Sequence, residues 1–299
     1  MTDKQTPPIE KHKAPPPDDM AADFTVPQHW ERYSEEEHRT WDILYKRQEK
    51  LLPGFAEDSY LAGLQVLNLH RGGIPNFDDL NEDLEKLTGW TIVSVPCLVP
   101  DDIFFEHLAN RRFPAGNFIR RPDQLDYIQE PDVFHDVFGH VPMLTNPVFA
   151  DYMQAYGEGG LRSLNYDCLK NLAALYWYTV EFGLIKTDKG LRIYGAGIVS
   201  SASETRFCVE DPSPNRLEFD LERVMRTDYI IDDFQQTYFV IDSYESLFKA
   251  TVDTDFGPLY ERLPKLTRFS VTDIVDDKEI IHKGTQAYAN SGGRFAEAG

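Results

Sequence analysis

Two histidines and a glutamate are the residues of this chain whose types and spacing best suit chemistry. His135 and His140 lie in segment 131–140, PDVFHDVFGH, and Glu181 lies in segment 176–184, YWYTVEFGL. Two imidazoles and a carboxylate, with no cysteine among them, match the ligand set of a non-haem iron(II) site. A structural zinc site would instead be closed by four protein ligands. The pattern therefore indicates a metal site with positions left open for dioxygen, water or substrate.

The spacing of the two histidines decides how they can meet at one ion. A step of five residues turns an α-helix by about 500°, which leaves the two side chains about 140° apart around the axis. Gly139 and Pro142 are residue types that commonly follow a helix end. We therefore expect His135 in the last turn of a helix and His140 on a loop that folds back.

Glu181 lies in an apolar and aromatic run over residues 167–184, which predicts a helix. Trp177, four residues earlier, shares its helical face. Burying a carboxylate there is costly unless a metal or a hydrogen-bond donor accepts it. Taken alone, Glu181 also fits a hydrogen-bonded or surface glutamate. The two histidines alone fit hydrogen-bonded core residues as well as ligands, so spacing by itself leaves these alternatives open.

Composition narrows the class of protein. The chain has 299 residues, a hydrophobic content of 41% and a formal net charge of −20. That length suits one sizeable domain with short appendages. The negative charge argues against nucleic-acid and anionic-membrane partners, because both favour a basic face.

The cysteines, at positions 97, 168 and 208, form no CxxC pair. This sparse, odd number suits a reducing cytoplasm and offers no disulfide framework. The N-terminus shows no secretory leader, and no stretch of about 18 apolar residues occurs. We therefore expect a soluble, cytoplasmic protein.

The rest of the chain predicts one mostly α-helical domain with a small antiparallel β component. Residues 1–24 are rich in proline and are expected to be a disordered tail. Residues 25–266 form the expected catalytic domain, and residues 267–299 are polar and weakly patterned, which predicts a loosely attached tail. Ser34 and Glu37 read as a capping box that opens a helix ending at Pro53. Further helices are expected near 57–69, 78–87, 102–110, 147–157, 167–183, 220–227 and 243–251, and strands at 91–95 and 191–194. Residues 195–197, GAG, lack the third glycine of a dinucleotide fingerprint and predict a tight backbone turn.

Several long segments resemble the pterin-dependent aromatic amino acid hydroxylases, and among these most closely the short bacterial enzymes that act on phenylalanine. The resemblance covers roughly residues 25 to 265, in the order of the family. It rests on segments 100–113 (PDDIFFEHLANRRF), 127–142 (YIQEPDVFHDVFGHVP), 176–184 (YWYTVEFGL), 194–201 (YGAGIVSS) and 238–243 (YFVIDS).

The resemblance implies roles for individual residues. His135, His140 and Glu181 would hold iron(II). Tetrahydropterin would stack on Phe104, meet the backbone around Val95, Leu98 and Val99, and lie near Asp136, Ala173 and Tyr176. Cys97 stands in the expected pterin loop where many relatives carry glycine, so the resemblance does not define the contacts of that loop here. Relatives also often carry glutamate at the position of Asp136.

The amino acid substrate would be bound by a second group of residues. Arg120 would bind its carboxylate with a planar two-donor fork; the alternative for this arginine is a surface ion pair. Trp177 would pack against the ring, Gly197 and Ser200 would line the site, and Val240 occupies a position associated with substrate choice. Ile128 is apolar where some relatives carry threonine.

The implied activity is hydroxylation of L-phenylalanine to L-tyrosine with iron(II), a tetrahydropterin and dioxygen. Tryptophan, tyrosine or another ring position remain alternatives, as do a zinc hydrolase and a non-catalytic pterin- or metal-binding protein. The long N-terminal regulatory region and C-terminal heptad helix of animal relatives have no counterpart here. We therefore expect a monomer with small-molecule partners only.

Overall fold

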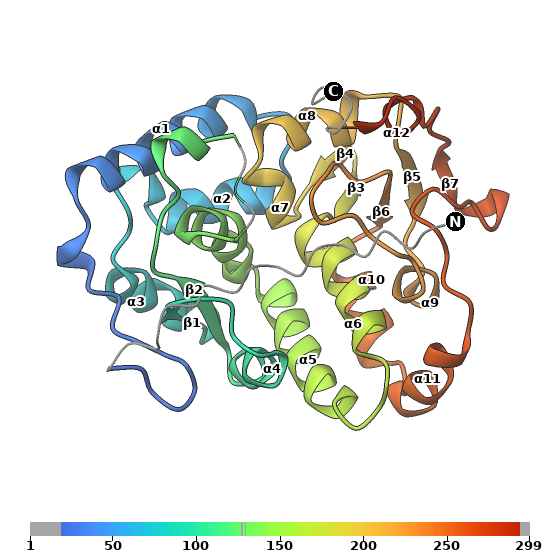
Figure 1. Ribbon diagram of the computed structural model, residues 1–299, viewed down its shortest axis with the longest axis horizontal. Coiled ribbons are helices and arrows are strands. Elements are labelled where there is room, and N and C mark those ends of the chain that lie inside the picture. The colour runs from blue at the N-terminus through green and yellow to red at the C-terminus, as the bar shows by residue number, and fades with distance from the viewer. Residues whose placement is uncertain (1–18, 127, 129, 294–299) are drawn as a thin grey trace.

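Helices make up most of the fold, and two small sheets complete it (Figure 1). The computed structural model describes residues 19–126, 128 and 130–293. Its α-helices are α1 (Glu35–Leu51), α2 (Asp58–Val66), α3 (Phe77–Thr88), α4 (Asp101–Ala109), α5 (Pro147–Ser163), α6 (Leu169–Tyr176), α7 (Ala196–Val199), α8 (Ala202–Glu210), α9 (Leu221–Met225), α10 (Tyr244–Val252), α11 (Phe256–Arg262) and α12 (Ala287–Asn290). Two π-helices, η4 (Phe134–His140) and η6 (Trp177–Glu181), interrupt this α-helical pattern. Short 3-10 segments lie at 30–32, 69–71, 122–124, 141–145, 263–265 and 277–279.

Local sequence signals account for the helices that we expected. α1 begins at Ser34, whose side chain accepts the backbone N–H of Glu37 while Glu37 accepts the backbone N–H of Ser34, at 3.3 and 2.7 Å. This capping box satisfies two backbone donors that a helix start leaves unpaired. The helices α2 to α6, α9 and α10 also lie where the sequence predicts them. Their ends agree within a few residues, except that α5 runs on to Ser163 and α6 ends at Tyr176, where the π-helix η6 begins.

The sheets are mixed, so the prediction of an antiparallel β component is wrong in part. β1 (Thr91–Val95) pairs in parallel with β2 (Arg112–Gly116). The second sheet has the order β4-β3-β6-β5-β7. Its strands are β3 (Leu184–Thr187), β4 (Gly190–Ile193), β5 (Asn215–Glu218), β6 (Thr237–Ile241) and β7 (Ile280–His282). β6 runs parallel to both β3 and β5, whereas β3–β4 and β5–β7 are antiparallel. The parallel pairs arise because helices such as α4 and α9 lie between the strands and provide crossovers.

The segment that follows residue 266 is part of the folded structure up to residue 293. Its strand β7 extends the sheet, and Arg268 Nε lies 2.5 Å from Asp228 Oδ1. Phe269 lies beneath two guanidinium groups, those of Arg223 and Arg226, at 4.5 and 4.3 Å from its ring centre. The contacts of this segment, which the sequence predicts as a loosely attached tail, are charged and aromatic rather than aliphatic.

The expected N-terminal tail, residues 1–24, lies mostly outside the described residues. Its last part is described, and Asp23 pairs there with Arg112 at 3.0 Å. The carbonyl oxygen of Asp23 also accepts a hydrogen bond from the buried ring of His107 at 2.9 Å.

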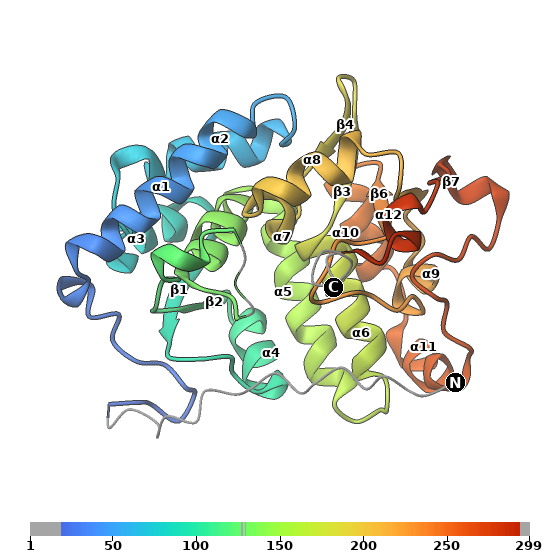
Figure 2. The same ribbon diagram turned by 45° about the horizontal axis from the view of Figure 1, so that its top comes forward.

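Two central helices, α5 and α6, run side by side between the β1–β2 pair and the five-stranded sheet (Figures 1 and 2). Helices α1 and α2 pack on η4 through aromatic rings. Trp41 meets Phe134 edge to face with ring centres 5.2 Å apart, and Phe134 stacks on Phe138 at 4.7 Å. Tyr60 donates its hydroxyl proton to the carbonyl of Phe138 at 2.7 Å. These fully buried contacts fix the position of the π-helix that carries both histidines.

Two further expectations concern the whole chain. Among the described residues, Cys97, Cys168 and Cys208 form no disulfide bond. Within the described part of the chain, no helix is both long and apolar enough to cross a membrane.

Candidate metal centre

His135 and His140 both lie inside the π-helix η4, so the prediction of a helix end followed by a loop is wrong. In a π-helix each N–H bonds to the carbonyl five residues earlier, and residues five apart therefore lie on the same side. The wider turn thus brings the two imidazoles together without a break. Gly139 serves packing instead: a Cβ there would lie 2.9 Å from the carbonyl oxygen of Ala196, so glycine lets α7 approach η4 closely.

Glu181 is the last residue of the second π-helix, η6, which continues directly from α6. Two glycines let the backbone around α7 approach this residue. A Cβ on Gly195 would lie 2.4 Å from the Glu181 carbonyl oxygen, and a Cβ on Gly197 would lie 3.2 Å from Glu181 Oε2. Residues 195–197, which the sequence predicts as a backbone turn, form the N-cap and the first residues of the short helix α7, and they face the candidate ligand.

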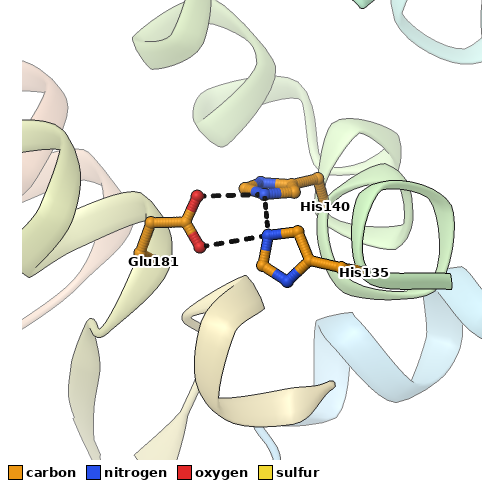
Figure 3. Close-up of side chains that lie close together, drawn as sticks. All are labelled: His135, His140 and Glu181. Carbon is orange, nitrogen blue, oxygen red and sulfur yellow. Dashed lines mark hydrogen bonds and ion pairs between the residues drawn. The ribbon is translucent and has the colours of Figure 1, made fainter. Parts of the chain in front are cut away.

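The three side chains converge on one point (Figure 3). The Nε2 atoms of His135 and His140 lie 3.3 Å apart. Glu181 faces both rings, with Oε1 3.2 Å from His140 Nε2 and Oε2 3.5 Å from His135 Nε2. Donor atoms that share one ion at about 2.1 Å lie about 3.0 to 3.4 Å apart for right-angled to tetrahedral geometry. Two of the three separations fall in this range and the third, 3.5 Å, lies just above it, so this donor set without thiolate fits a single divalent cation.

Ser200 fixes the tautomer of His135. Its hydroxyl donates to the carbonyl of Ala196 at 2.8 Å, and its oxygen lies 3.1 Å from His135 Nδ1. Because the hydroxyl proton is used on Ala196, the ring must donate from Nδ1, which leaves the lone pair of Nε2 facing the centre. Such an outer hydrogen bond commonly orients a metal-binding histidine. Ser200, expected to line the amino acid site, lies in the cavity wall and also positions a candidate ligand.

The electrostatics of the centre favour a cation. Burial alone would raise the pKa of Glu181, but the facing rings of His140 and His135 outweigh burial and hold this pKa far below its usual range. Burial lowers the pKa of the His135 ring, and the charge of Glu181 more than offsets this, so the pKa is raised. The carboxylate thus stays ionised beside two ring nitrogens.

A cavity of about 700 Å³ opens onto this centre. Its wall includes His135 and Glu181 together with six other residues that the sequence singled out: Leu98, Arg120, Tyr176, Trp177, Gly197 and Ser200. Ile128 lines the same cavity. Its volume lies within the usual range of small-molecule sites, and its lining is largely apolar and aromatic.

Arg120 is buried in the cavity wall and forms an internal ion pair with Asp132, not a surface one. Its Nε and Nη2 atoms donate to the two carboxylate oxygens of Asp132, both at 2.8 Å. Asp132 also accepts the backbone N–H groups of Arg120 and His135, at 2.9 and 3.0 Å. Nη1 makes a long contact of 3.5 Å with the Leu125 carbonyl, so the guanidinium keeps donor capacity toward the cavity.

Trp177 belongs to an aromatic cluster at the cavity wall. Its ring stacks on Tyr229 with centres 4.6 Å apart and an interplanar angle of 20°. Phe182 packs against it at 4.9 Å. All three side chains line the cavity, which suits contact with a flat apolar ring.

Several residues expected on the pterin side lie on one flank of the centre. The ring of Phe104, on α4, meets Tyr176 edge to face at 5.6 Å, and Tyr176 in turn lies 6.2 Å from the ring of His140. Ala173 lies on α6, three residues before Tyr176. Val95 ends β1, and Leu98 and Val99 follow it in the connection to α4.

Asp136 links the π-helix to this flank. Its Oδ2 accepts the backbone N–H of Gly116 at 2.8 Å, and Gly116 is the β2 residue paired with Val95. Burial raises the pKa of Asp136 to about 6, against the opposing attraction of His135. The side chain therefore holds the end of the β1–β2 pair against η4.

One predicted substrate residue does not reach the cavity. Val240 lies in the middle of β6, is 1% exposed and packs in the core of the sheet. The lining residues of the cavity do not include it.

Other residues of the site were missed by sequence reasoning. Asp132 stands three residues before His135, and its place in the same motif was the only available signal, because its partner Arg120 is twelve residues away. Tyr229 and Gln235, which contact Trp177, lie in a loop more than fifty residues away from it and carry no local signal.

Comparison with known proteins agrees with the geometry of the site. The family model described as biopterin-dependent aromatic amino acid hydroxylase matches residues 18–272. A phenylalanine-4-hydroxylase of Caulobacter vibrioides is 62% identical over 95% of this chain and 96% of its own length. The phenylalanine-4-hydroxylase of Ralstonia nicotianae is 61% identical over 89% of this chain and 85% of its own.

Solved structures of phenylalanine hydroxylase from Chromobacterium violaceum share the fold. The structure with bound oxidised Fe(III) matches with a TM-score of 0.85 and 58% identity, over 87% of this chain and 94% of that one. The structure with iron and phenylalanine bound matches with a TM-score of 0.82 and 57% identity, over 86% and 93% of the two chains. The chain therefore belongs to the biopterin-dependent aromatic amino acid hydroxylases.

Proposed function

We propose that this protein is an iron(II)- and tetrahydropterin-dependent monooxygenase that hydroxylates L-phenylalanine to L-tyrosine with dioxygen. The observation that carries the proposal is the convergence of two histidines and one glutamate on the wall of an aromatic cavity. Membership of the hydroxylase family and the close relatives with phenylalanine-4-hydroxylase activity in their names support this substrate.

His135, His140 and Glu181 would hold the iron. Three protein ligands leave coordination positions open, and bound iron with reduced pterin supplies the activation of dioxygen. Ser200 keeps the Nδ1 proton on His135 and so keeps Nε2 directed at the metal. Glu181 is already ionised, so its negative charge can balance part of the charge of the iron without first losing a proton.

Arg120 would bind the substrate carboxylate and Trp177 would hold the ring. The ion pair with Asp132 orients the guanidinium before substrate arrives, which lowers the ordering cost of binding. The aromatic wall of Trp177, Phe182 and Tyr229 offers the ring a dry surface at the edge of the metal centre. Gly197 leaves room beside Glu181, where any side chain would crowd the carboxylate.

The pterin would lie on the flank formed by Phe104, Tyr176 and the connection that follows β1. Phe104 offers a ring face, and Leu98 and Val99 offer backbone groups from that connection. Ala173 borders the same region from α6, and Asp136 holds Gly116 and thus the end of β1 in place.

We also propose a monomer that works in the cytoplasm. Cys97, Cys168 and Cys208 form no disulfide bond in the described part of the chain, which suits a reducing compartment. Light scattering in solution should give the mass of one chain, 34.4 kDa; the mass of two chains would overturn the monomer.

The test of the proposed function is an aerobic assay of iron(II)-loaded protein with L-phenylalanine and tetrahydropterin, followed by chromatography of the products. Tyrosine is expected only when iron, pterin and dioxygen are all present. Turnover of tryptophan alone would show that the substrate is tryptophan rather than phenylalanine. Hydroxylation of phenylalanine at another ring position would change the assigned product. Protein that binds iron but converts no aromatic amino acid would contradict the proposal.

A further inference from the structure

A buried glutamine, Gln235, contacts the indole of Trp177 from behind the cavity wall. It is 1% exposed and lies in the loop between α9 and β6. Its Oε1 accepts the indole N–H of Trp177 at 3.0 Å. The indole has no other polar group, so this bond and ring packing alone fix its rotation.

Both the oxygen and the nitrogen of the Gln235 side-chain amide have hydrogen-bond partners. Oε1 also accepts the backbone N–H of Ile230 at 3.2 Å. Nε2 donates to the carbonyl oxygens of Ile230 and Asp233, at 2.5 and 3.3 Å. Two donors thus face the amide oxygen and two acceptors face the amide nitrogen. Among side chains of this length, only an uncharged amide supplies both functions at once.

The loop that Gln235 holds is itself part of the cavity wall. Tyr229 stacks on the Trp177 indole, and Ile231 and Asp233 line the cavity. The backbone of Gln235 is anchored in turn, because its N–H donates to Glu204 Oε1 at 3.3 Å. Glu204 also accepts the hydroxyl of Tyr238, from β6. The glutamine therefore joins the indole, the loop and the sheet in one hydrogen-bonded unit.

We infer that Gln235 is a positioning residue for substrate binding: it sets the angle of the Trp177 indole and holds the loop 229–233 against it. This inference rests on the proposed function, in which Trp177 packs against the phenylalanine ring. Gln235 touches neither substrate nor metal and acts only through Trp177 and the loop. Loss of its amide frees the indole to rotate and leaves its N–H without an acceptor, while the iron ligands keep their positions.

The test compares Gln235→Met, Trp177→Phe and the double variant, because methionine has nearly the length of glutamine and phenylalanine lacks the indole N–H. Gln236→Leu is the matched control. Gln236 is the neighbouring buried glutamine, bonds the same loop through the Phe234 carbonyl at 2.9 Å, and does not contact Trp177. Three quantities are measured: iron content, the dissociation constant of L-phenylalanine by calorimetry without pterin, and tyrosine formed per tetrahydropterin consumed.

Gln235→Met should bind phenylalanine about tenfold more weakly, which corresponds to the loss of one buried hydrogen bond, and should form less tyrosine per pterin. Its iron content should match that of the unchanged protein. In the Trp177→Phe background the same substitution should weaken binding by less than about twofold, because no indole N–H remains to be held. Gln236→Leu should bind phenylalanine like the unchanged protein.

Unchanged phenylalanine binding in Gln235→Met would overturn the inference, and so would an equal loss in the Trp177→Phe background, which would reveal a purely structural role. If Gln235→Met does not fold, Gln235→Leu replaces it, because leucine is also uncharged and lacks the acceptor for the indole N–H. The same weaker phenylalanine binding is then expected, and an equal loss in the Trp177→Phe background would contradict the role. A parent protein that makes no tyrosine refutes the proposed function, whereas the binding comparison still decides the inference.

Discussion

At the scale of single residues, the metal centre depends on a charge balance that few side chains maintain. Glu181 stays ionised in a buried place because two imidazoles face it. His135 presents Nε2 because its Nδ1–H group donates a hydrogen bond to Ser200 Oγ. Removal of any one of the three candidate ligands therefore leaves the other two without the partner that balances their charge or orients them.

Alanine at His135, His140 or Glu181 should remove most of the bound iron. Two remaining ligands cannot hold a divalent ion at the affinity that three provide, and activity should fall with iron content. Metal analysis after dialysis of each variant measures the loss. Full iron retention in all three variants would refute the ligand assignment.

Arg120→Met should raise the KM for L-phenylalanine by about tenfold to a hundredfold, because a charged hydrogen bond to the substrate carboxylate is lost. The unpaired Asp132 also destabilises the variant, so a second substrate separates the two effects. Phenethylamine lacks the carboxylate, so the parent protein and Arg120→Met should bind it, and turn it over, equally poorly. A similar loss for both compounds would show that Arg120 acts through the fold alone.

At the scale of elements, the site depends on two π-helices that the sequence did not reveal. The predicted periodicity was that of an α-helix, in which residues 135 and 140 diverge. The residues of the triad were predictable from their types and from the surrounding motifs, but the helix that unites them was not. Nor were the parallel strands: β6 is buried on both faces and shows no alternation that would distinguish it from other apolar runs.

Gly197→Ala should weaken iron binding several-fold with little change in the fold. The added Cβ would lie 3.0 Å from Phe182 Cζ and 3.2 Å from Glu181 Oε2, so the carboxylate must shift. Gly159→Ala is the matched control. Gly159 lies on α5, and a Cβ there would lie at a similar distance, 3.2 Å, from the Tyr260 hydroxyl. Gly159 does not line the cavity beside the metal centre. Iron affinity measured by chelator competition should fall only in the first variant, and an equal affinity in both would contradict this packing role.

At the scale of the whole molecule, the C-terminal segment completes the sheet that supports the site. Its contacts could not be read from hydrophobic periodicity, since β7 pairs with β5, and Phe269 and Glu279 contact Arg223 of α9. The metal ligands, the aromatic wall and many helices were visible in local patterns, whereas this attachment depends on partners far apart in sequence. We propose that the catalytic domain extends past the expected limit at residue 266.

Arg223→Ala should lower the free energy of unfolding by about 3 kcal/mol, because it leaves a nearly buried carboxylate without its partner. Arg223 Nε lies 3.1 Å from Glu279 Oε2, and its Nη2 donates to the carbonyl of Asp273 at 2.6 Å. Iron content should not change. Denaturant unfolding of the iron-loaded variant provides the measurement, and a loss below about 0.5 kcal/mol would contradict a structural role for the segment.

The central claim is that this site places an oxygen atom from dioxygen on the ring of phenylalanine. It is tested most directly by turnover under isotope-labelled dioxygen, with mass spectrometry of the tyrosine formed by iron-loaded protein and tetrahydropterin. We predict one labelled oxygen atom in each new hydroxyl group and no labelled tyrosine from the Glu181→Ala variant. Unlabelled tyrosine, or labelled tyrosine formed equally well without Glu181, would contradict the account.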